Sequence, residues 1–144
     1  ALDEINAMLG LALAYDLDEQ TRRDLLMMQR YLYQLSAHLA SFGAIAPKPA
    51  LDDMLATLER GIADGYALFA DDTQFIYYGG RPGPAAVQVA RAICRRAEVL
   101  LWDACAETAF EPALSKVINR LSLWLFYVGR AANVRLGQTE EHVR

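Results

Sequence analysis

The chain has 144 residues, enough for one domain with its own apolar core. Hydrophobic residues make up 54% of the chain and charged residues 22%, a composition that excludes intrinsic disorder. The formal net charge of −4 argues against a nucleic-acid binder, and no apolar stretch approaches the roughly 20 residues that cross a bilayer. Asp3 and Glu4 stand where a signal peptide would carry basic residues. We therefore expect a single soluble, cytoplasmic domain over residues 1–144.

Cysteine and histidine spacing excludes several kinds of site. Cys94 and Cys105 fall on one predicted helix, where their separation of roughly 16 Å is too long for a disulfide. We expect free, buried thiols, as in a reducing compartment. His38 and His142 have no partner at metal-ligand spacing, and neither lysine follows a glycine-rich loop. The sequence therefore predicts neither a protein-ligated metal nor a P-loop.

Apolar residues recur every three or four positions from the N-terminus onward, which is the period of a helix. The first predicted helix covers residues 3–15, and a turn at residues 16–18 separates it from a second predicted helix over residues 19–41. Residues 42–50 hold one glycine and two prolines and are predicted to form a loop. A third predicted helix follows over residues 51–68.

Residues 70–84 interrupt the helical period, because they hold three glycines and two prolines. Pro84 suits the first turn of a fourth predicted helix over residues 84–106. A fifth predicted helix covers residues 112–136, and Gly137 is placed as its C-terminal stop. Five helices, with residues 70–84 as the one distinctive loop, predict an all-α fold, a five-helix antiparallel bundle.

Three arginines and a glutamate interrupt the apolar pattern of the fourth predicted helix. Arg91, Arg95 and Glu98 share one face of that helix, and Arg96 lies about 100° from Arg95. The simpler interpretation is a solvated face on which Arg91 or Arg95 pairs with Glu98. The alternative is a guanidinium cluster that binds a polyphosphate, for which the planar fork of arginine is suited.

The loop before that helix reads Phe75-Ile76-Tyr77-Tyr78-Gly79-Gly80. One interpretation is a surface loop with its glycines at positive φ. The other is a lid that faces a ligand, in which the aromatic side chains contact a flat ring and the glycines allow close backbone approach.

Further polar residues lie inside predicted helices. Asn119 and Arg120 fall within the apolar fifth helix, where asparagine is mildly unfavourable and is expected to find a hydrogen-bond partner. Asp3 and Asn6 share a face of the first helix, although a carboxylate at a helix start usually compensates the helix dipole. Spacing alone does not decide between structural and functional roles for these residues.

The order of these segments along the chain adds a further signal. The segments are Asp3-Glu4-Ile5-Asn6, Phe75-Ile76 with Gly79-Gly80, Cys94-Arg95-Arg96-Ala97-Glu98, Asn119-Arg120-Leu121-Ser122, and Leu125-Phe126 with Arg130. In this order they resemble the ATP:corrinoid adenosyltransferases of the propanediol-utilisation type. The resemblance covers essentially the whole chain, and it implies a cobalamin adenosyltransferase-like bundle, a ferritin-like arrangement that forms homotrimers with sites between subunits.

The resemblance also implies an activity. Enzymes of this type transfer the 5′-deoxyadenosyl group of ATP to the cobalt of cob(I)alamin or a related corrinoid, giving adenosylcobalamin and triphosphate. ATP, accompanied by Mg²⁺, and the corrinoid would be the substrates, and the cobalt would arrive with the corrinoid. A reductase and a cobalamin-dependent acceptor enzyme would be further partners.

Individual roles follow from the same resemblance. Arg95 and Arg96 would be the catalytic residues, handling phosphates and pairing between subunits, with Asp3 as the partner across the trimer. Aromatic side chains would form an apolar wall above the cobalt and strip its axial ligands. Besides Asp3, the residues expected to bind the substrates are Asn6, Phe75, Tyr77, Tyr78, Arg91, Glu98, Asn119 and Phe126.

The chain also departs from the family pattern. The phosphate-binding Thr-Gly-Asp-x-Gly-x-Thr loop of the family does not precede Ala1 in this sequence. Gln88 replaces a histidine, Val99 replaces an arginine, and Leu123 replaces an aspartate. These departures concern ATP more than the corrinoid. They leave open a non-catalytic homologue that binds a corrinoid or another tetrapyrrole as a carrier or sensor, and a purely structural helical trimer.

Overall fold

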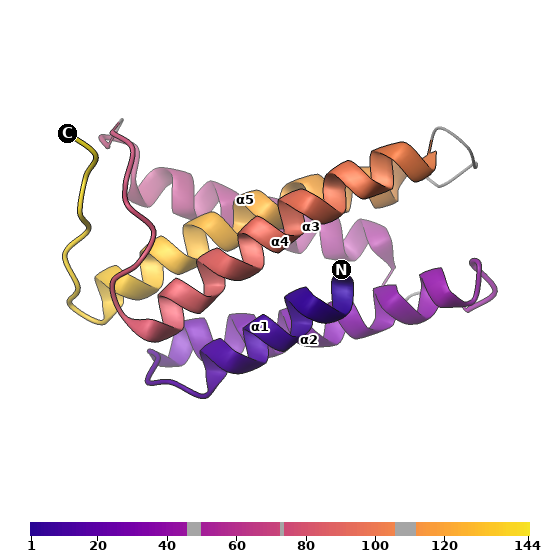
Figure 1. Cartoon of the computed structure of the whole chain (residues 1–144), viewed down its shortest axis with the longest axis horizontal. Coiled ribbons are helices and arrows are strands. Elements are labelled where there is room, and N and C mark those ends of the chain that lie inside the picture. The colour runs from indigo at the N-terminus through magenta and orange to yellow at the C-terminus, as the bar shows by residue number, and fades with distance from the viewer. Residues whose placement is uncertain (46–49, 73, 106–111) are drawn as a thin grey trace.

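A computed structural model describes residues 1–45, 50–72, 74–105 and 112–144. It contains five helices, which run alternately up and down the bundle and confirm the predicted all-α architecture (Figure 1). They are α1 (Leu2–Leu13), α2 (Glu19–Ala40), α3 (Leu51–Leu68), α4 (Pro82–Cys105) and α5 (Pro112–Arg135). None of the helices in the described ranges is both long enough and apolar enough to cross a bilayer.

The helix boundaries agree with the predicted ones to within two residues, and the start of α4 is the informative difference. The sequence predicts a start at Pro84, but α4 begins at Pro82, and the amide of Ala85 donates to the carbonyl of Arg81 at 3.0 Å. The first turn therefore holds both prolines, because amides there have no partner within the helix and a proline loses nothing. The predicted end of this helix at Ala106 lies outside the described residues.

The helices pack in a continuous order around one core. Helix α5 lies between α3 and α4, while α4 also packs on α1, which in turn packs on α2. The apolar stripe of α2 is buried as its three- and four-residue spacing predicts: Leu25, Met28, Leu32 and Leu35 are fully buried, and Leu39 near the end of the helix is partly buried. The connection before α4 and the C-terminal segment lie at the same end of the bundle (Figure 1), and the candidate site is built there.

Two glycines of α3 set its distance from α5. A Cβ atom added at Gly65 would lie 2.5 Å from Cβ of Tyr127, and one added at Gly61 would overlap the indole of Trp124. The two helix backbones therefore approach more closely than any side chain at these positions would allow. This close packing fixes the part of α5 that carries the polar residues described below.

Candidate active site

A groove of about 340 Å³ runs between α4 and α5, and three of the predicted polar residues line it: Arg91, Arg95 and Asn119. Asn119 Nδ2 donates a 2.7 Å hydrogen bond to Oε1 of Glu98, which confirms that this helix-interior asparagine has a partner. The other carboxylate oxygen of Glu98 lies 3.8 Å from Nη1 of Arg95, as the spacing on one helix face predicts. Glu98 is 15% exposed and Arg95 is 63% exposed, so a largely buried carboxylate orients a guanidinium that remains open to the groove.

Arg91 lines the same groove but is held by different partners. Its guanidinium carbon lies 4.4 Å from the centre of the Tyr78 ring, a cation–π contact. Its Nε atom donates to Oε1 of Gln88 at 3.0 Å, and Gln88 in turn donates to the carbonyl of Phe126 at 3.2 Å. Arg91 therefore joins residues 75–80, which we call the aromatic loop, to α4, rather than pairing with Glu98.

The aromatic loop meets α5 at the edge of this groove. The rings of Tyr78 and Phe126 pack edge to face with their centres 6.5 Å apart. The side chain of Phe75 is 84% exposed, and that of Tyr77 is also exposed. Two of the four predicted wall residues thus contact each other, and the three that lie on the loop are all more than half exposed.

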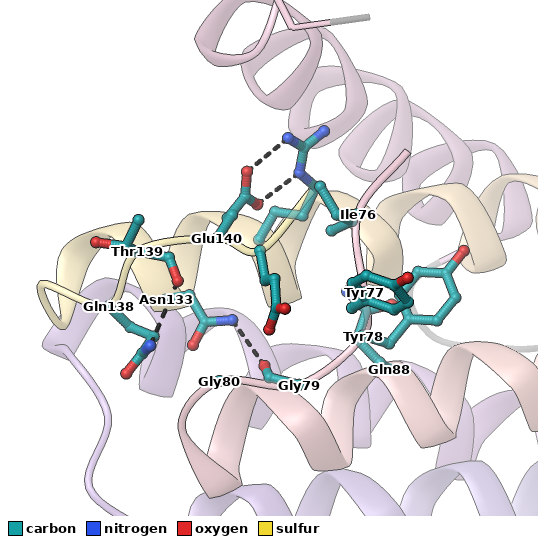
Figure 2. Close-up of a pocket in the computed structure, with 12 residues that line it drawn as sticks. Ile76, Tyr77, Tyr78, Gly79, Gly80, Gln88, Asn133, Gln138, Thr139 and Glu140 are labelled. Atoms are coloured by element: carbon teal, nitrogen blue, oxygen red, sulfur yellow. Dashed lines mark hydrogen bonds and ion pairs between the residues drawn. The ribbon is translucent and has the colours of Figure 1, made fainter. Parts of the chain in front are cut away.

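Asn133 of α5 fixes the glycines that end the loop. Its Nδ2 donates to the carbonyl of Gly79 at 2.9 Å (Figure 2), and its Oδ1 accepts from the amide of Arg81 at 3.1 Å. Gly80 has φ of +87°, and a Cβ atom there would lie 2.5 Å from Oδ1 of Asn133. The predicted positive φ is therefore confirmed at Gly80 and is wrong at Gly79, which has an ordinary negative-φ backbone.

A smaller polar cavity of about 180 Å³ lies beneath this loop (Figure 2). Among the residues that line it are Tyr77, Tyr78, Gly79, Gln88, Arg130, Asn133, Thr139 and Glu140. The cavity is closed on one side by the C-terminal segment that follows α5, so the loop is not a free surface loop. Sequence spacing did not predict this contact.

Arg130 of α5 is the most buried charged side chain near the site. It is 5% exposed, donates twice to Glu140 at 2.7 Å, and donates to Asp72 at 2.8 Å. Its guanidinium also covers the ring of Phe69 at 3.9 Å. The pairing with Glu140 raises the pKa of Arg130 above its usual value.

Asp72, Glu140 and His142 form a group with metal-ligand chemistry, and their ligand atoms lie within 4.8 Å of one another. Both carboxylates are already paired with Arg130, which places a cation among them. The Nε2 atom of His142 donates to Asp72 at 2.8 Å, and this bond holds the pKa of Asp72 below its ordinary range. The arrangement is therefore complete as an ion-pair network.

Sequence reasoning missed Asp72, Glu140, His142 and Asn133 as parts of the site, and it used Arg130 only as a point of family resemblance. Within the apolar sequence of α5, Arg130 and Asn133 are three residues apart and therefore share a face. Polar residues at that spacing on a buried helix were the available signal.

Three predicted site residues lie away from the groove within this chain. Arg96 pairs with Glu4 of α1 at 2.7 Å, on a different face of α4. Asn6 and Gln29 exchange hydrogen bonds between α1 and α2, each side chain donating to the other's backbone carbonyl at 3.2 Å. Asp3 is exposed near the N-terminus and lines a separate apolar depression.

The predicted buried thiol is confirmed at Cys94. Its sulfur lies 3.5 Å from the carbonyl of Ile118, and burial raises the pKa of the thiol to about 12. A thiol with this pKa is protonated at neutral pH and is a poor nucleophile. The side chain of Cys105 lies outside the described residues.

Comparison with known proteins decides the family. The model of the family described as "Cobalamin adenosyltransferase" matches residues 1–132 of this chain. The chain belongs to this family. The resemblance noted in the sequence is thereby confirmed.

Similar members of the cobalamin adenosyltransferase family come from several bacteria. The chain is 34% identical over 133 residues to a cobalamin adenosyltransferase of Cupriavidus metallidurans, covering 92% of this chain and 71% of that protein. It is 33% identical over 134 residues to the corrinoid adenosyltransferase PduO of Salmonella typhimurium, covering 90% of this chain but 40% of that protein. A solved variant of the PduO-type ATP:corrinoid adenosyltransferase of Lactobacillus reuteri, complexed with cobalamin and ATP, matches with a TM-score of 0.86 at 25% identity, covering 99% of this chain and 82% of that one.

The departures from the cobalamin adenosyltransferase pattern fall at identifiable places in the structure. Val99 follows Glu98 on α4 and is 62% exposed, so an apolar surface stands where the resemblance expects a guanidinium. Leu123 lines the groove between α4 and α5. Gln88 is buried and bonds both Arg91 and the backbone of α5. Gln88 therefore keeps a polar connection at its position, whereas Val99 and Leu123 each remove a charge.

Proposed function

We propose that this chain transfers the 5′-deoxyadenosyl group of ATP to the cobalt of cob(I)alamin or a related corrinoid, giving adenosylcobalamin and triphosphate. The observation that supports the proposal is that a groove lined by arginine side chains lies next to a pair of packed aromatic rings, which we call the aromatic edge. Arg91 and Arg95 line the groove, and the Tyr78–Phe126 pair borders it. Family membership over residues 1–132 supports the same activity.

The charge that develops in this reaction explains the arginines. Cobalt(I) attacks the 5′ carbon of ATP, a cobalt–carbon bond forms, and the carbon–oxygen bond breaks with its electron pair leaving on triphosphate. The protein must hold both substrates in line and stabilise the leaving anion. Among the described residues, Arg95 has one ion-pair contact, at 3.8 Å, and its other guanidinium donors are open to phosphate oxygens. Glu98, held by Asn119, orients Arg95, and Mg²⁺ arrives with ATP.

The aromatic residues suit the corrinoid. Phe126 and Tyr78 form one continuous apolar edge, and Tyr77 and Phe75 expose their rings on the same loop. An apolar wall above the cobalt excludes water and favours loss of its axial ligands, which eases reduction to cobalt(I). A reductase would supply that electron, and a cobalamin-dependent enzyme would consume the product.

We infer that the site is completed by a second copy of the chain in a homotrimer. A groove of about 340 Å³ is at the lower end of pockets for one drug-sized ligand, and two larger substrates must share it. Apolar side chains of α4 also remain exposed, among them Val99, Leu100 and Trp102. Asp3 is the proposed intersubunit partner of an arginine.

Sedimentation tests this assembly directly. The protein should sediment as a trimer at micromolar concentration, and a 16.0 kDa species there would refute the inference. Asp3→Asn and Arg96→Ala should each weaken assembly while the helical content stays unchanged. Glu19→Gln, an exposed carboxylate at the start of α2, is the matched control for Asp3→Asn.

A second candidate function is supported by Val99 and Leu123. Loss of an arginine and of an aspartate lowers the capacity for ATP and leaves the aromatic edge intact, as in a homologue that binds a corrinoid without transfer. Cytoplasmic location is part of both proposals.

One assay separates the two candidates. The purified protein is mixed with cobalamin under a chemical reductant, with and without ATP and Mg²⁺, and the visible spectrum and the released triphosphate are followed. Adenosylcobalamin and triphosphate in equal amounts support the transferase. A cobalamin spectral shift without triphosphate supports the binding homologue. No spectral change on adding cobalamin refutes both.

A further inference from the structure

Arg130 connects two segments that are far apart in the sequence. It projects from α5 toward Asp72, which follows α3, and toward Glu140 in the C-terminal segment. Glu140 accepts through both of its oxygens, a bidentate geometry that fixes its direction as well as its distance (Figure 2). The guanidinium is almost fully buried and makes cation–π contacts with the rings of Phe69 and Phe126, at 3.9 Å and 5.5 Å from their centres.

The C-terminal segment is also paired with the aromatic loop. The amide of Tyr77 donates to the carbonyl of Glu141, and the amide of Val143 donates to the carbonyl of Phe75, each at 2.8 Å. Between these bonds lies a single β-bridge that pairs residues 76 and 142. The segment therefore alternates its contacts, since the side chain of Glu140 reaches the Arg130 network while the next backbone carbonyl binds the loop.

The two paired segments, residues 75–77 and 141–143, form a short ribbon that needs further interactions to stay ordered. Two isolated strands are at best marginally stable in water, and two backbone hydrogen bonds do not offset the entropy lost when both segments become ordered. The ion pairs of Arg130 stabilise the ribbon at one end through Glu140, and the bond between His142 and Asp72 holds it at a second point. A buried guanidinium is costly unless carboxylates pair with it, and one of the carboxylates that pair with Arg130 is Glu140 of the C-terminal segment. The position of Arg130 therefore fixes the position of this segment.

We propose that Arg130 is a positioning residue, which fastens residues 138–143 along the aromatic loop and thereby holds Tyr77 and Tyr78 at the corrinoid-binding edge. The proposal rests on the function proposed above. Arg130 does not line the groove between α4 and α5 in the described structure; it acts through Glu140 and through Phe126, whose ring contacts both the guanidinium and Tyr78. The C-terminal segment thus supports the loop through the side chain of Glu140 and through backbone hydrogen bonds.

The test uses Glu140→Gln, which removes one carboxylate from Arg130 at a position outside the helices. Glu141→Gln is the matched control, because it makes the same change one residue later, where the side chain is exposed. Hydrogen exchange of the Tyr77 and Val143 amides reports the ribbon, and titration with cobalamin, followed by absorbance, reports the site. Melting curves of the same samples report global stability.

We expect Glu140→Gln to raise the exchange rate of both amides at least tenfold and to weaken cobalamin binding at least fivefold, with the control unchanged in both. Asp72→Asn should act in the same direction. Unchanged exchange in Glu140→Gln would overturn the fastening role. Faster exchange with unchanged cobalamin affinity would overturn the positioning role. If the parent protein leaves the cobalamin spectrum unchanged, the proposed function and the positioning role fail together, and the exchange rates still decide whether Arg130 fastens the segment.

Discussion

Replacement of Arg95 by alanine tests the proposed phosphate-binding role most directly. The side chain is 63% exposed in the groove, and its ion-pair partner Glu98 is 3.8 Å away and separately held by Asn119. Its removal therefore leaves neither a cavity in the core nor a buried carboxylate without a hydrogen bond. The structure thus predicts a change in ligand binding that is separate from any change in folding.

The magnitudes of the two effects differ enough to be measured. An exposed ion pair contributes about 0–1 kcal/mol to stability, which shifts the melting temperature of a domain of this size by no more than about 4 °C. A hydrogen bond to a charged group is worth about 1.5–3 kcal/mol, and about 1.4 kcal/mol corresponds to a factor of ten. Arg95→Ala should therefore lower ATP affinity or turnover about ten- to a hundredfold, with little change in melting temperature.

The assay is a nucleotide titration of parent and variant, with adenosyl transfer and melting curves measured on the same samples. Arg23→Ala is the matched control, since Arg23 is exposed on α2 and its hydrogen bond, at 3.5 Å, is to Gln20 of the same helix. Arg95→Lys should recover part of the affinity, because it restores the charge without the planar fork. A fall in melting temperature with unchanged ATP affinity would refute the phosphate-binding role and make Arg95 a structural residue.

Three further predictions concern packing, acid stability and thiol reactivity. Gly65→Ala should destabilise the fold by about 1–2 kcal/mol in a melting curve, because the clash with Cβ of Tyr127 outweighs the better helix propensity of alanine. Asp72 has a folded pKa below its unfolded value, so its contribution to stability is present above pH ~4 and is lost as the pH falls through the folded pKa; acid titration of the melting temperature, with Asp72→Asn as reference, measures it. In a Cys105→Ser background, Cys94 should resist iodoacetamide at pH 8 until the protein unfolds, since its pKa is about 12.

Each of these has a contrary result. Gly79→Ala adds a methyl group in open space, and equal destabilisation by this change and by Gly65→Ala would contradict the packing argument. If Asp72→Asn keeps the full acid sensitivity of the parent, the carboxylate of Asp72 is not its source. Rapid alkylation of Cys94 in the native protein would contradict its burial.

The helices were predictable because the information for each one is local. The three- and four-residue spacing of Leu25, Met28, Leu32 and Leu35 decides both the helix and its buried face, and all four are fully buried. The start of α4 was missed by two residues because Pro82 and Pro84 fit equally well in a first turn. Only the carbonyl that accepts the first helical hydrogen bond distinguishes the two starts.

The site was predictable to the extent that it lies on one helix face. Arg91, Arg95 and Glu98 share a face by spacing alone, and the structure places both arginines in the groove and Glu98 beside Arg95. The contacts of Arg130 could not be predicted in this way, because they join residues far apart in the sequence. Asp72 is 58 residues from Arg130, and His142, which bonds to Asp72, is 70 residues from Asp72. Pairings across such separations depend on how the helices pack, and no local period encodes them.

Arg95 and Arg96 are adjacent in sequence, yet one phosphate site within one chain cannot use both in the same way. Neighbouring side chains on a helix point about 100° apart, so Arg95 faces the groove while Arg96 faces α1 and pairs with Glu4. Both members of that pair are more than half exposed, and an exposed pair is weak enough for a carboxylate of another subunit to replace Glu4 at little energetic loss. The helix geometry therefore supports the proposed division, in which Arg95 would bind the substrate on one face of α4 and Arg96 would pair with a neighbouring subunit on the other.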